Sequence, residues 1–182
     1  TVGRLNRVIH RSGLSSRFIS LFYGELDEAG NLVYVNGGHP PPLLFTPGGE
    51  TFELKTCGPV LGPLPEANYR RSYVTMRPGE ILVLFTDGVT ERLHPDSAAE
   101  TEADEGTEDI VQFGLDGIVE VVCAHSGKSA ADLVKAIVKR VRKFGDGAAF
   151  EDDVSVMVVR RLGTRDYPPA EDLTPVSVET RR

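Results

Sequence analysis

The order of its predicted elements assigns this 182-residue chain to the α+β class, with antiparallel sheets. Three observations predict this class. Short apolar segments alternate with turns rich in Gly, Pro and Asn, two helical segments lie together towards the C-terminal end, and strands do not alternate with helices. Hairpin connections make successive strands antiparallel, whereas parallel strands need a long crossover between them. The segregated helices therefore favour a layered α+β domain.

The first half of the chain is predicted to contain the end of a helix and six strands. Apolar side chains at positions 5, 8 and 9 follow helical spacing, and Gly13 is a plausible helix end. Segments rich in β-branched and aromatic residues predict the strands, and Gly, Pro, Asp and Asn between them predict turns at 27–31, 47–49 and 78–79. The predicted strands are 18–26, 32–35, 43–46, 51–55, 69–76 and 81–85, the last wholly apolar and expected to be buried on both faces.

The second half is predicted to contain two helices and a final strand. Helical spacing covers 115–124 and 130–144, with Ser129 as a candidate N-cap, and 154–160 is apolar enough for a strand. Segment 96–109 carries seven acidic residues and no apolar residue larger than alanine, so we expect a flexible acidic loop. Residues 163–182 are expected to form a loose tail.

Charge and composition exclude some functions. The net charge of −7 argues against a general binder of nucleic acid or of membrane surfaces, and no apolar run reaches the ~18 residues of a membrane span. Arginines at 4, 7 and 11 interrupt any secretory signal, and the missing initiator Met suggests an excerpt from a longer chain. Cys57 and Cys123 form no Cys-x-x-Cys pair, so we expect buried thiols in a reducing, cytoplasmic setting.

Two acidic positions at strand ends are candidates for chemistry. Asp87 follows the buried strand and precedes Gly88, which would let a ligand approach the backbone, although an Asp-Gly pair is also an ordinary turn. Glu151, Asp152 and Asp153 precede the last strand, and their mutual repulsion would be relieved by a divalent cation or, equally, by water in a solvated loop. If the two strands are neighbours, Asp87 and Asp152 converge.

His39 lies in a loop of Gly and Pro residues, where a histidine could be a base or a ligand, and it is interpreted as structural. It has no cysteine or second histidine at metal-ligand spacing, and it can hydrogen-bond backbone groups that the prolines leave unpaired. No Gly-rich phosphate loop, nucleophile elbow or His-Glu-x-x-His motif is present.

Four motifs, in order, resemble a known enzyme family. The chain is similar to the metal-dependent serine/threonine phosphatases of the stage-II-sporulation-E and RsbU type, within the PP2C superfamily. Gly58-Pro-Val-Leu-Gly62 also resembles that family's loop ending in Leu-Gly. The motifs are Phe18-Ile-Ser-Leu-Phe-Tyr-Gly24, Tyr34-Val-Asn-Gly-Gly-His-Pro-Pro-Pro-Leu-Leu44, Leu84-Phe-Thr-Asp-Gly-Val-Thr-Glu-Arg92 and Glu151-Asp-Asp-Val-Ser155.

The resemblance implies an α-β-β-α sandwich of antiparallel sheets with two Mn²⁺ or Mg²⁺ ions between them. The resemblance implies that Asp87 and Asp152 are catalytic metal ligands and that Asp153 is a further ligand of lower rank. Gly88 would let the cofactor come close to the backbone. The implied reaction is hydrolysis of phosphoserine or phosphothreonine by metal-activated water. The implied partner is a small cytoplasmic regulator, a phosphorylated anti-sigma-factor antagonist, with a sensor domain upstream and neither nucleic acid nor membrane contacted by this segment.

The chain departs from the family pattern in ways that bear on activity. The upstream Asp motif and Asp-x-x-Gly-x-Gly motif of the family do not occur, so residues 1–162 would be the C-terminal part of the domain, lacking its N-terminal elements, followed by the tail at 163–182. The acidic segment is longer than the family's usual connection. We therefore expect this chain alone to be inactive as a phosphatase. The alternative is a non-catalytic, phosphatase-like module that binds a signalling partner.

Overall fold

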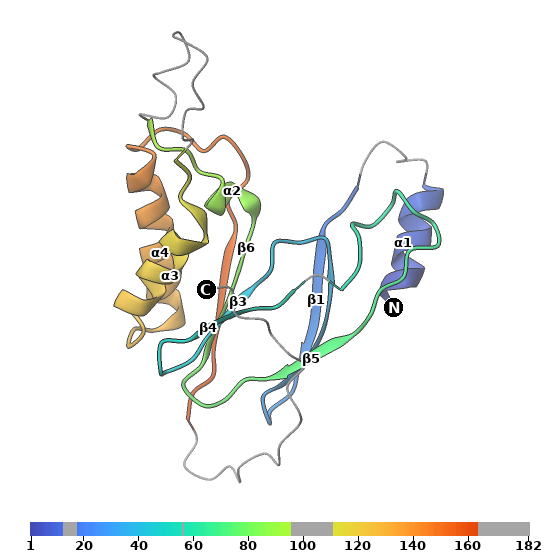
Figure 1. Cartoon of the computed structure of the whole chain (residues 1–182), viewed down its shortest axis with the longest axis horizontal. Coiled ribbons are helices and arrows are strands. Elements are labelled where there is room, and N and C mark those ends of the chain that lie inside the picture. The colour runs from blue at the N-terminus through green and yellow to red at the C-terminus, as the bar shows by residue number, and fades with distance from the viewer. Residues whose placement is uncertain (13–17, 56, 96–110, 164–182) are drawn as a thin grey trace. The chain divides into compact units, whose positions relative to one another are not determined.

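The computed structural model describes residues 1–12, 18–55, 57–95 and 111–163, which form two compact units (Figure 1). The first unit comprises Thr1–Ile81 and the described residues from Arg161 onward, and the second comprises Leu82–Arg160. The predictions for Gly13, for the acidic segment 96–109 and for the tail beyond Gly163 lie outside the described residues.

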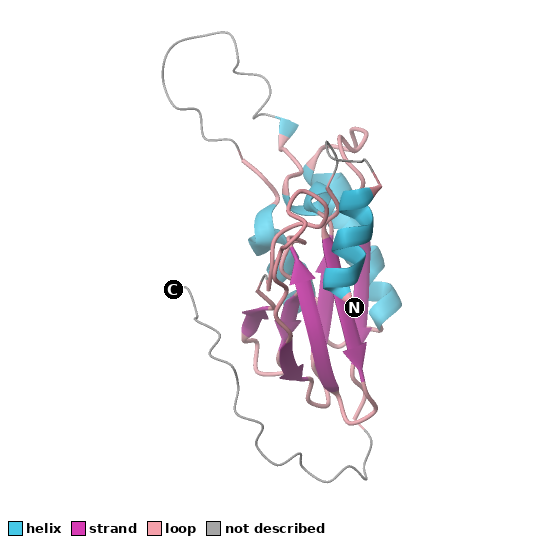
Figure 2. Cartoon of the chain, turned by 90° about the vertical axis from the view of Figure 1, so that its right-hand side faces the viewer, coloured by secondary structure: helices cyan, strands magenta, loops and turns pink. Residues whose placement is uncertain are grey.

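The first unit contains one helix, a three-stranded sheet and the two strands of a hairpin. The sheet has the order β1-β2-β5, and both of its strand pairs are antiparallel. Figure 2 draws the strands as magenta arrows. The strands β3 and β4 form an antiparallel hairpin. The elements are α1 (Val2–Arg11), β1 (Leu21–Leu26), β2 (Asn31–Gly37), β3 (Leu43–Phe45), β4 (Thr51–Glu53) and β5 (Ser72–Thr75).

The turn between β1 and β2 shows how the sequence fixes the sheet register. The Asp27 carboxylate accepts hydrogen bonds from the backbone N–H and the side-chain amide of Asn31, at 2.8 and 3.0 Å. Gly30 has a φ of +91°, which a residue with a side chain adopts only with strain. This turn sets Leu26 opposite Leu32 and Leu21 opposite Gly37.

One end of this sheet carries a small core beneath α1. Val2 of α1 packs with Val35 of β2 and with Leu61, and all three are buried. Asn6, on the same face of the helix, donates to the Leu64 carbonyl and accepts from the Gly62 N–H. Apolar packing and these hydrogen bonds together fasten α1 to the loop that follows Cys57.

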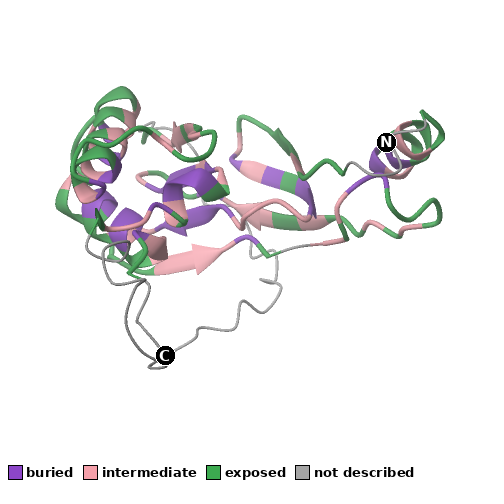
Figure 3. Cartoon of the chain, turned by 90° about the horizontal axis from the view of Figure 1, so that it is seen from above, coloured by how far each residue is buried: buried purple, intermediate pink, exposed green. Residues whose placement is uncertain are grey.

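The second unit consists of two neighbouring strands and the helices that pack against them. The strands β6 and β7 are adjacent, and hydrogen bonds from Thr86 N to Ser155 O and from Arg161 N to Glu80 O make them antiparallel. Leu133, Ile137 and Val141 form the buried face of the last helix, at spacings of four residues (Figure 3). The elements are β6 (Ile81–Phe85), α2 (Asp87–Thr90), α3 (Gly114–Ala124), α4 (Ala130–Phe144) and β7 (Val156–Arg160).

The predicted fold class is confirmed, since the structure is a mixed α+β chain with antiparallel sheets. Several details differ from prediction. The first strand begins at Leu21 rather than at Phe18, whose side chain is exposed, and the fifth covers only Ser72–Thr75. Helix α2 was not predicted. Cys123 is exposed, so the prediction that it is buried was wrong, whereas Cys57 is partly buried. Among the described helices, none is long and apolar enough to cross a membrane.

Candidate functional site

The segment that leaves β6 is hydrogen-bonded to the segment that enters β7. The Thr86 N–H donates to the Ser155 carbonyl at 3.1 Å, and the Ser155 N–H donates to the Thr86 hydroxyl at 2.9 Å. The same hydroxyl donates to the Asp153 carbonyl at 2.7 Å. The condition set by the sequence, that the two strands are neighbours, is therefore met. Sequence reasoning did not single out Thr86, although a hydroxyl residue directly after a buried strand was a usable signal.

Gly88 lies in van der Waals contact with the segment 151–153. It is buried, and a Cβ atom placed on it would lie 2.7 Å from the Asp153 carbonyl oxygen and 3.3 Å from the Asp152 carbonyl carbon. Any side chain at position 88 would push the two segments apart. The close approach expected at Gly88 thus involves the protein's own backbone, and the residue's place beside a cofactor remains a prediction.

The carboxylates of Asp87 and Asp152 are exposed and have similar local hydrogen bonds. Asp87 Oδ1 accepts from the Gly88 N–H at 3.0 Å, and Asp152 Oδ1 accepts from the Asp153 N–H at 2.7 Å. Within the described part of the chain, no lysine or arginine forms a salt bridge with either group. Each carboxylate therefore keeps an oxygen that can bind a cation.

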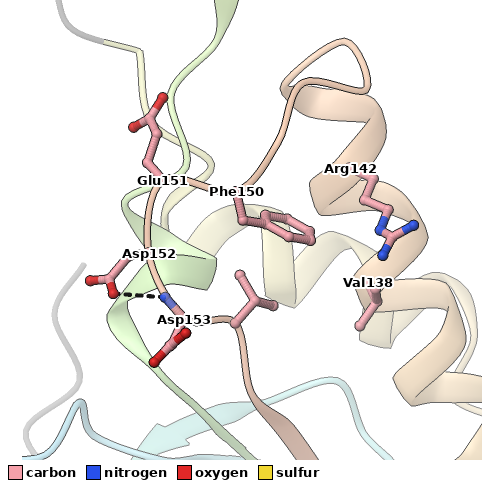
Figure 4. Close-up of a pocket in the computed structure, with 7 residues that line it drawn as sticks. Val138, Arg142, Phe150, Glu151, Asp152 and Asp153 are labelled. Atoms are coloured by element: carbon pink, nitrogen blue, oxygen red, sulfur yellow. Dashed lines mark hydrogen bonds between the residues drawn. The ribbon is translucent and has the colours of Figure 1, made fainter.

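An open pocket of about 550 Å³ lies beside the acidic residues 151–153. The ring of Phe150 points towards Val138 and Arg142 of α4, whereas the carboxylates of Glu151 and Asp152 point away from that helix (Figure 4). The acidic groups thus lie on the rim of the pocket rather than on its apolar wall. The lining residues are Val138, Arg142, Phe150, Glu151, Asp152, Asp153 and Val154.

The residues present fit a divalent cation in chemistry but not in number. Carboxylate oxygens are the ligands that Mg²⁺ and Mn²⁺ prefer, and Asp87, Asp152 and Asp153 offer them on adjoining segments. Among the described residues, however, no group of three or more His, Cys, Asp or Glu side chains is placed to hold a metal ion. Within the described ranges, these carboxylates do not make up a metal site by themselves.

His39 makes the structural contacts expected of it. Its ring Nδ1 lies 2.9 Å from the Pro40 carbonyl, and its backbone N–H donates to the Asn36 side-chain oxygen at 2.9 Å. Asn36, which is fully buried, donates back to the His39 carbonyl. These bonds hold the Gly/Pro loop after β2, in the first unit.

Comparison with protein families identifies the chain. Residues 1–162 match the family described as Stage II sporulation protein E (SpoIIE). The chain belongs to the SpoIIE family. It is 29% identical over 150 residues to protein IcfG of Synechocystis, and 29% identical over 159 residues to the phosphoserine phosphatase RsbU of Bacillus subtilis. These alignments cover 82% and 86% of the chain but only 22% of IcfG and 43% of RsbU.

Solved structures show the same fold. The PP2C domain of SiaA from Pseudomonas aeruginosa superposes with a TM-score of 0.63 at 18% identity, over 85% of this chain and 56% of that one. The fold of this SpoIIE-family chain is that of the PP2C phosphatases, as predicted, and the chain covers part of the PP2C domain. The relative RsbU is a phosphoserine phosphatase, and the family is one of serine/threonine phosphatases.

Proposed function

We propose that the complete domain containing this SpoIIE-family chain is a metal-dependent protein phosphatase. Its substrate would be phosphoserine or phosphothreonine on a regulatory protein such as an anti-sigma-factor antagonist, and its cofactors two Mn²⁺ or Mg²⁺ ions. One observation carries the proposal: the Thr86 hydroxyl and Gly88 join the segment bearing Asp87 to the one bearing Asp152 and Asp153. The similarity to the phosphoserine phosphatase RsbU agrees with it.

In this proposal the chain's own residues bind and orient. Asp87 and Asp152 would direct carboxylate oxygens to one place, and their hydrogen bonds to the following N–H groups would restrict their rotation. Asp153 is held through its carbonyl, which accepts from Thr86, and its side chain would be a lesser ligand. Divalent ions bound there would supply the positive charge that offsets the phosphoryl oxygens. The remaining ligands would come from outside the described residues.

The test uses the full-length protein, a phosphoserine-bearing regulatory protein and Mn²⁺. We expect manganese-dependent release of phosphate, and we expect Asp87→Asn and Asp152→Asn each to lower kcat by at least about 100-fold, the size seen when one electrostatic stabiliser is removed. Asp153→Asn should have a smaller effect. The matched control is Asp116→Asn, an exposed carboxylate on α3 of the same unit, which should leave kcat unchanged.

Two outcomes would contradict the proposal. Turnover that is unaffected by both Asp87→Asn and Asp152→Asn would mean that these residues are not ligands. Tight binding of the phosphorylated partner without any phosphate release, at any Mn²⁺ or Mg²⁺ concentration, would instead identify a non-catalytic, phosphatase-like binding module.

A further inference from the structure

Arg92 is a buried cation that the proposed reaction does not use. It follows α2 by two positions, and only 4% of its surface is exposed. Its Nη1 donates to the Ala149 carbonyl at 2.6 Å, and its Nη2 donates to the carbonyls of Ala148 and Gly145 at 2.8 and 3.2 Å. All three acceptors belong to the turn that connects α4 to the acidic residues 151–153.

The guanidinium group matters more here than the volume of the side chain. A buried charge loses its hydration, and an apolar side chain of similar length would fill the same space without that loss. The hydrogen bonds are what an apolar side chain could not provide: they satisfy the carbonyls of Ala148 and Ala149 and add a second donor to that of Gly145, which also accepts from the Ala148 N–H. The Phe150 ring adds a cation–π contact, with its centroid 5.4 Å from Arg92 Cζ.

Gly145 shows that the turn is built around this side chain. Its φ of −89° is one that any residue adopts, so backbone conformation does not require a glycine. A Cβ atom at position 145 would, however, lie 2.1 Å from both Nε and Nη2 of Arg92. The missing side chain at Gly145 makes room for the guanidinium group.

Arg92 therefore joins the same two segments that Thr86 joins. It follows the Asp87–Thr90 helix, and its acceptors lie in the turn shortly before Glu151-Asp152-Asp153 in the sequence. We propose that Arg92 is a positioning residue: by holding the turn at residues 145–149, its guanidinium group keeps Asp152 and Asp153 at a fixed place beside Asp87. This role in metal binding rests on the proposed function, whereas its role in holding the turn does not.

The first test needs no metal. Amide hydrogen exchange of the full-length protein, compared between wild type and Arg92→Ala, should show faster exchange in residues 145–153 while α3 and the middle of α4 keep their protection. The control is Lys139→Ala, an exposed cation on α4, which should change neither region. Unchanged exchange at 145–153 in a folded Arg92→Ala protein would overturn the proposal.

The second test measures Mn²⁺ binding directly, by titration calorimetry without substrate. Arg92→Ala should weaken binding by about 10- to 100-fold, as for other residues that orient metal ligands, and Arg92→Lys should recover part of the loss. Binding within about twofold of wild type in folded Arg92→Ala, the variation expected of an uncoupled site, would overturn the role in metal binding. If the wild-type protein binds no Mn²⁺, the proposed function fails, and the exchange experiment alone decides whether Arg92 holds the turn.

Gly145→Ala provides an independent variant in case Arg92→Ala does not fold. It leaves Arg92 in place but occupies the space of the guanidinium group, so Mn²⁺ binding should again weaken. Combined with Arg92→Ala, it should add less than about a twofold further loss, because the side chain with which it collides is gone. Losses that simply multiply would show that Gly145 and Arg92 act separately, and would overturn the proposal.

Discussion

The hydroxyl group of Thr86 makes two hydrogen bonds, and both reach the segment in front of β7. It donates to Asp153 O and accepts from Ser155 N, two groups that an apolar side chain at position 86 would leave without these partners. Beside it, Gly88 allows the backbones to touch. At the scale of single residues, the candidate site is thus defined by the neighbours of the carboxylates as much as by Asp87 and Asp152 themselves.

Glu80 allows a prediction about pH. Its side chain is 5% exposed, and burial raises the pKa of its carboxyl above the usual 4.5, although the Arg77 N–H and the charges of Arg77 and Arg161 oppose this. A raised folded-state pKa means that Glu80 contributes stability below its unfolded pKa and loses that contribution as pH rises through the folded value. Glu80→Gln should therefore gain unfolding free energy relative to wild type as pH rises, because the amide oxygen still accepts from Arg77 N.

The measurement is urea unfolding of the full-length protein and its variant, at pH values below and above the usual glutamate pKa. Unfolding is followed by a probe placed within the residues of this chain. Glu66→Gln, at an exposed position, is the control and should show no such trend. A stability difference between Glu80→Gln and wild type that stays constant with pH would contradict the assignment of the raised pKa to Glu80.

At the scale of elements, predictions succeeded where local signals mark both ends. Helix α4 runs from Ala130 to Phe144, as predicted, because Ser129 caps its start and its apolar residues repeat at helical spacing. The fifth strand was predicted too long because the chain before Ser72 bonds to a loop rather than to a strand: Arg70 N donates to Cys57 O. Helix α2 has four residues, too few for a periodic pattern to show.

Removal of the cap should destabilise α4 measurably. The Ser129 hydroxyl accepts from the Asp132 N–H at 3.2 Å and donates to the Asp132 carboxylate at 2.7 Å. We expect Ser129→Ala to lower the unfolding free energy by about 1 kcal/mol, the usual effect of losing an N-cap. Urea unfolding measures this, with the exposed Ser126→Ala as the matched control. Equal stability of the two variants would show that the cap contributes nothing.

At the scale of the whole molecule, the candidate site draws on residues far apart in sequence. The sequence indicated that Asp87 and Asp152 end apolar strands, but not that β6 and β7 are neighbours, because pairing between distant strands depends on the complete sheet rather than on local pattern. For the same reason the contacts of Arg92 with the turn 53 to 57 residues later could not be predicted.

The chain by itself should be inactive as a phosphatase. Two-metal sites need bridging ligands that hold the ions about 3.5–4 Å apart, and Mg²⁺ requires near-octahedral oxygen coordination. The described residues bring together no group of three candidate ligands, and the chain spans 43% of RsbU. We expect phosphate release with Mn²⁺ from the full-length protein but not from residues 1–182. Turnover by the short chain that Asp87→Asn abolishes would show that the site is complete as it stands.

The antiparallel pairing of β6 with β7 also has a consequence for biosynthesis. Thr86 and its partner Asp153 are 67 residues apart, so at roughly 5–20 residues per second the ribosome needs several seconds to add the second after the first. During that interval Asp87 follows β6, a strand whose neighbour β7 does not yet exist. A premature stop codon between Asp87 and Asp152 would release a product that carries Asp87 but not Asp152. Only translation through β7 completes the pair.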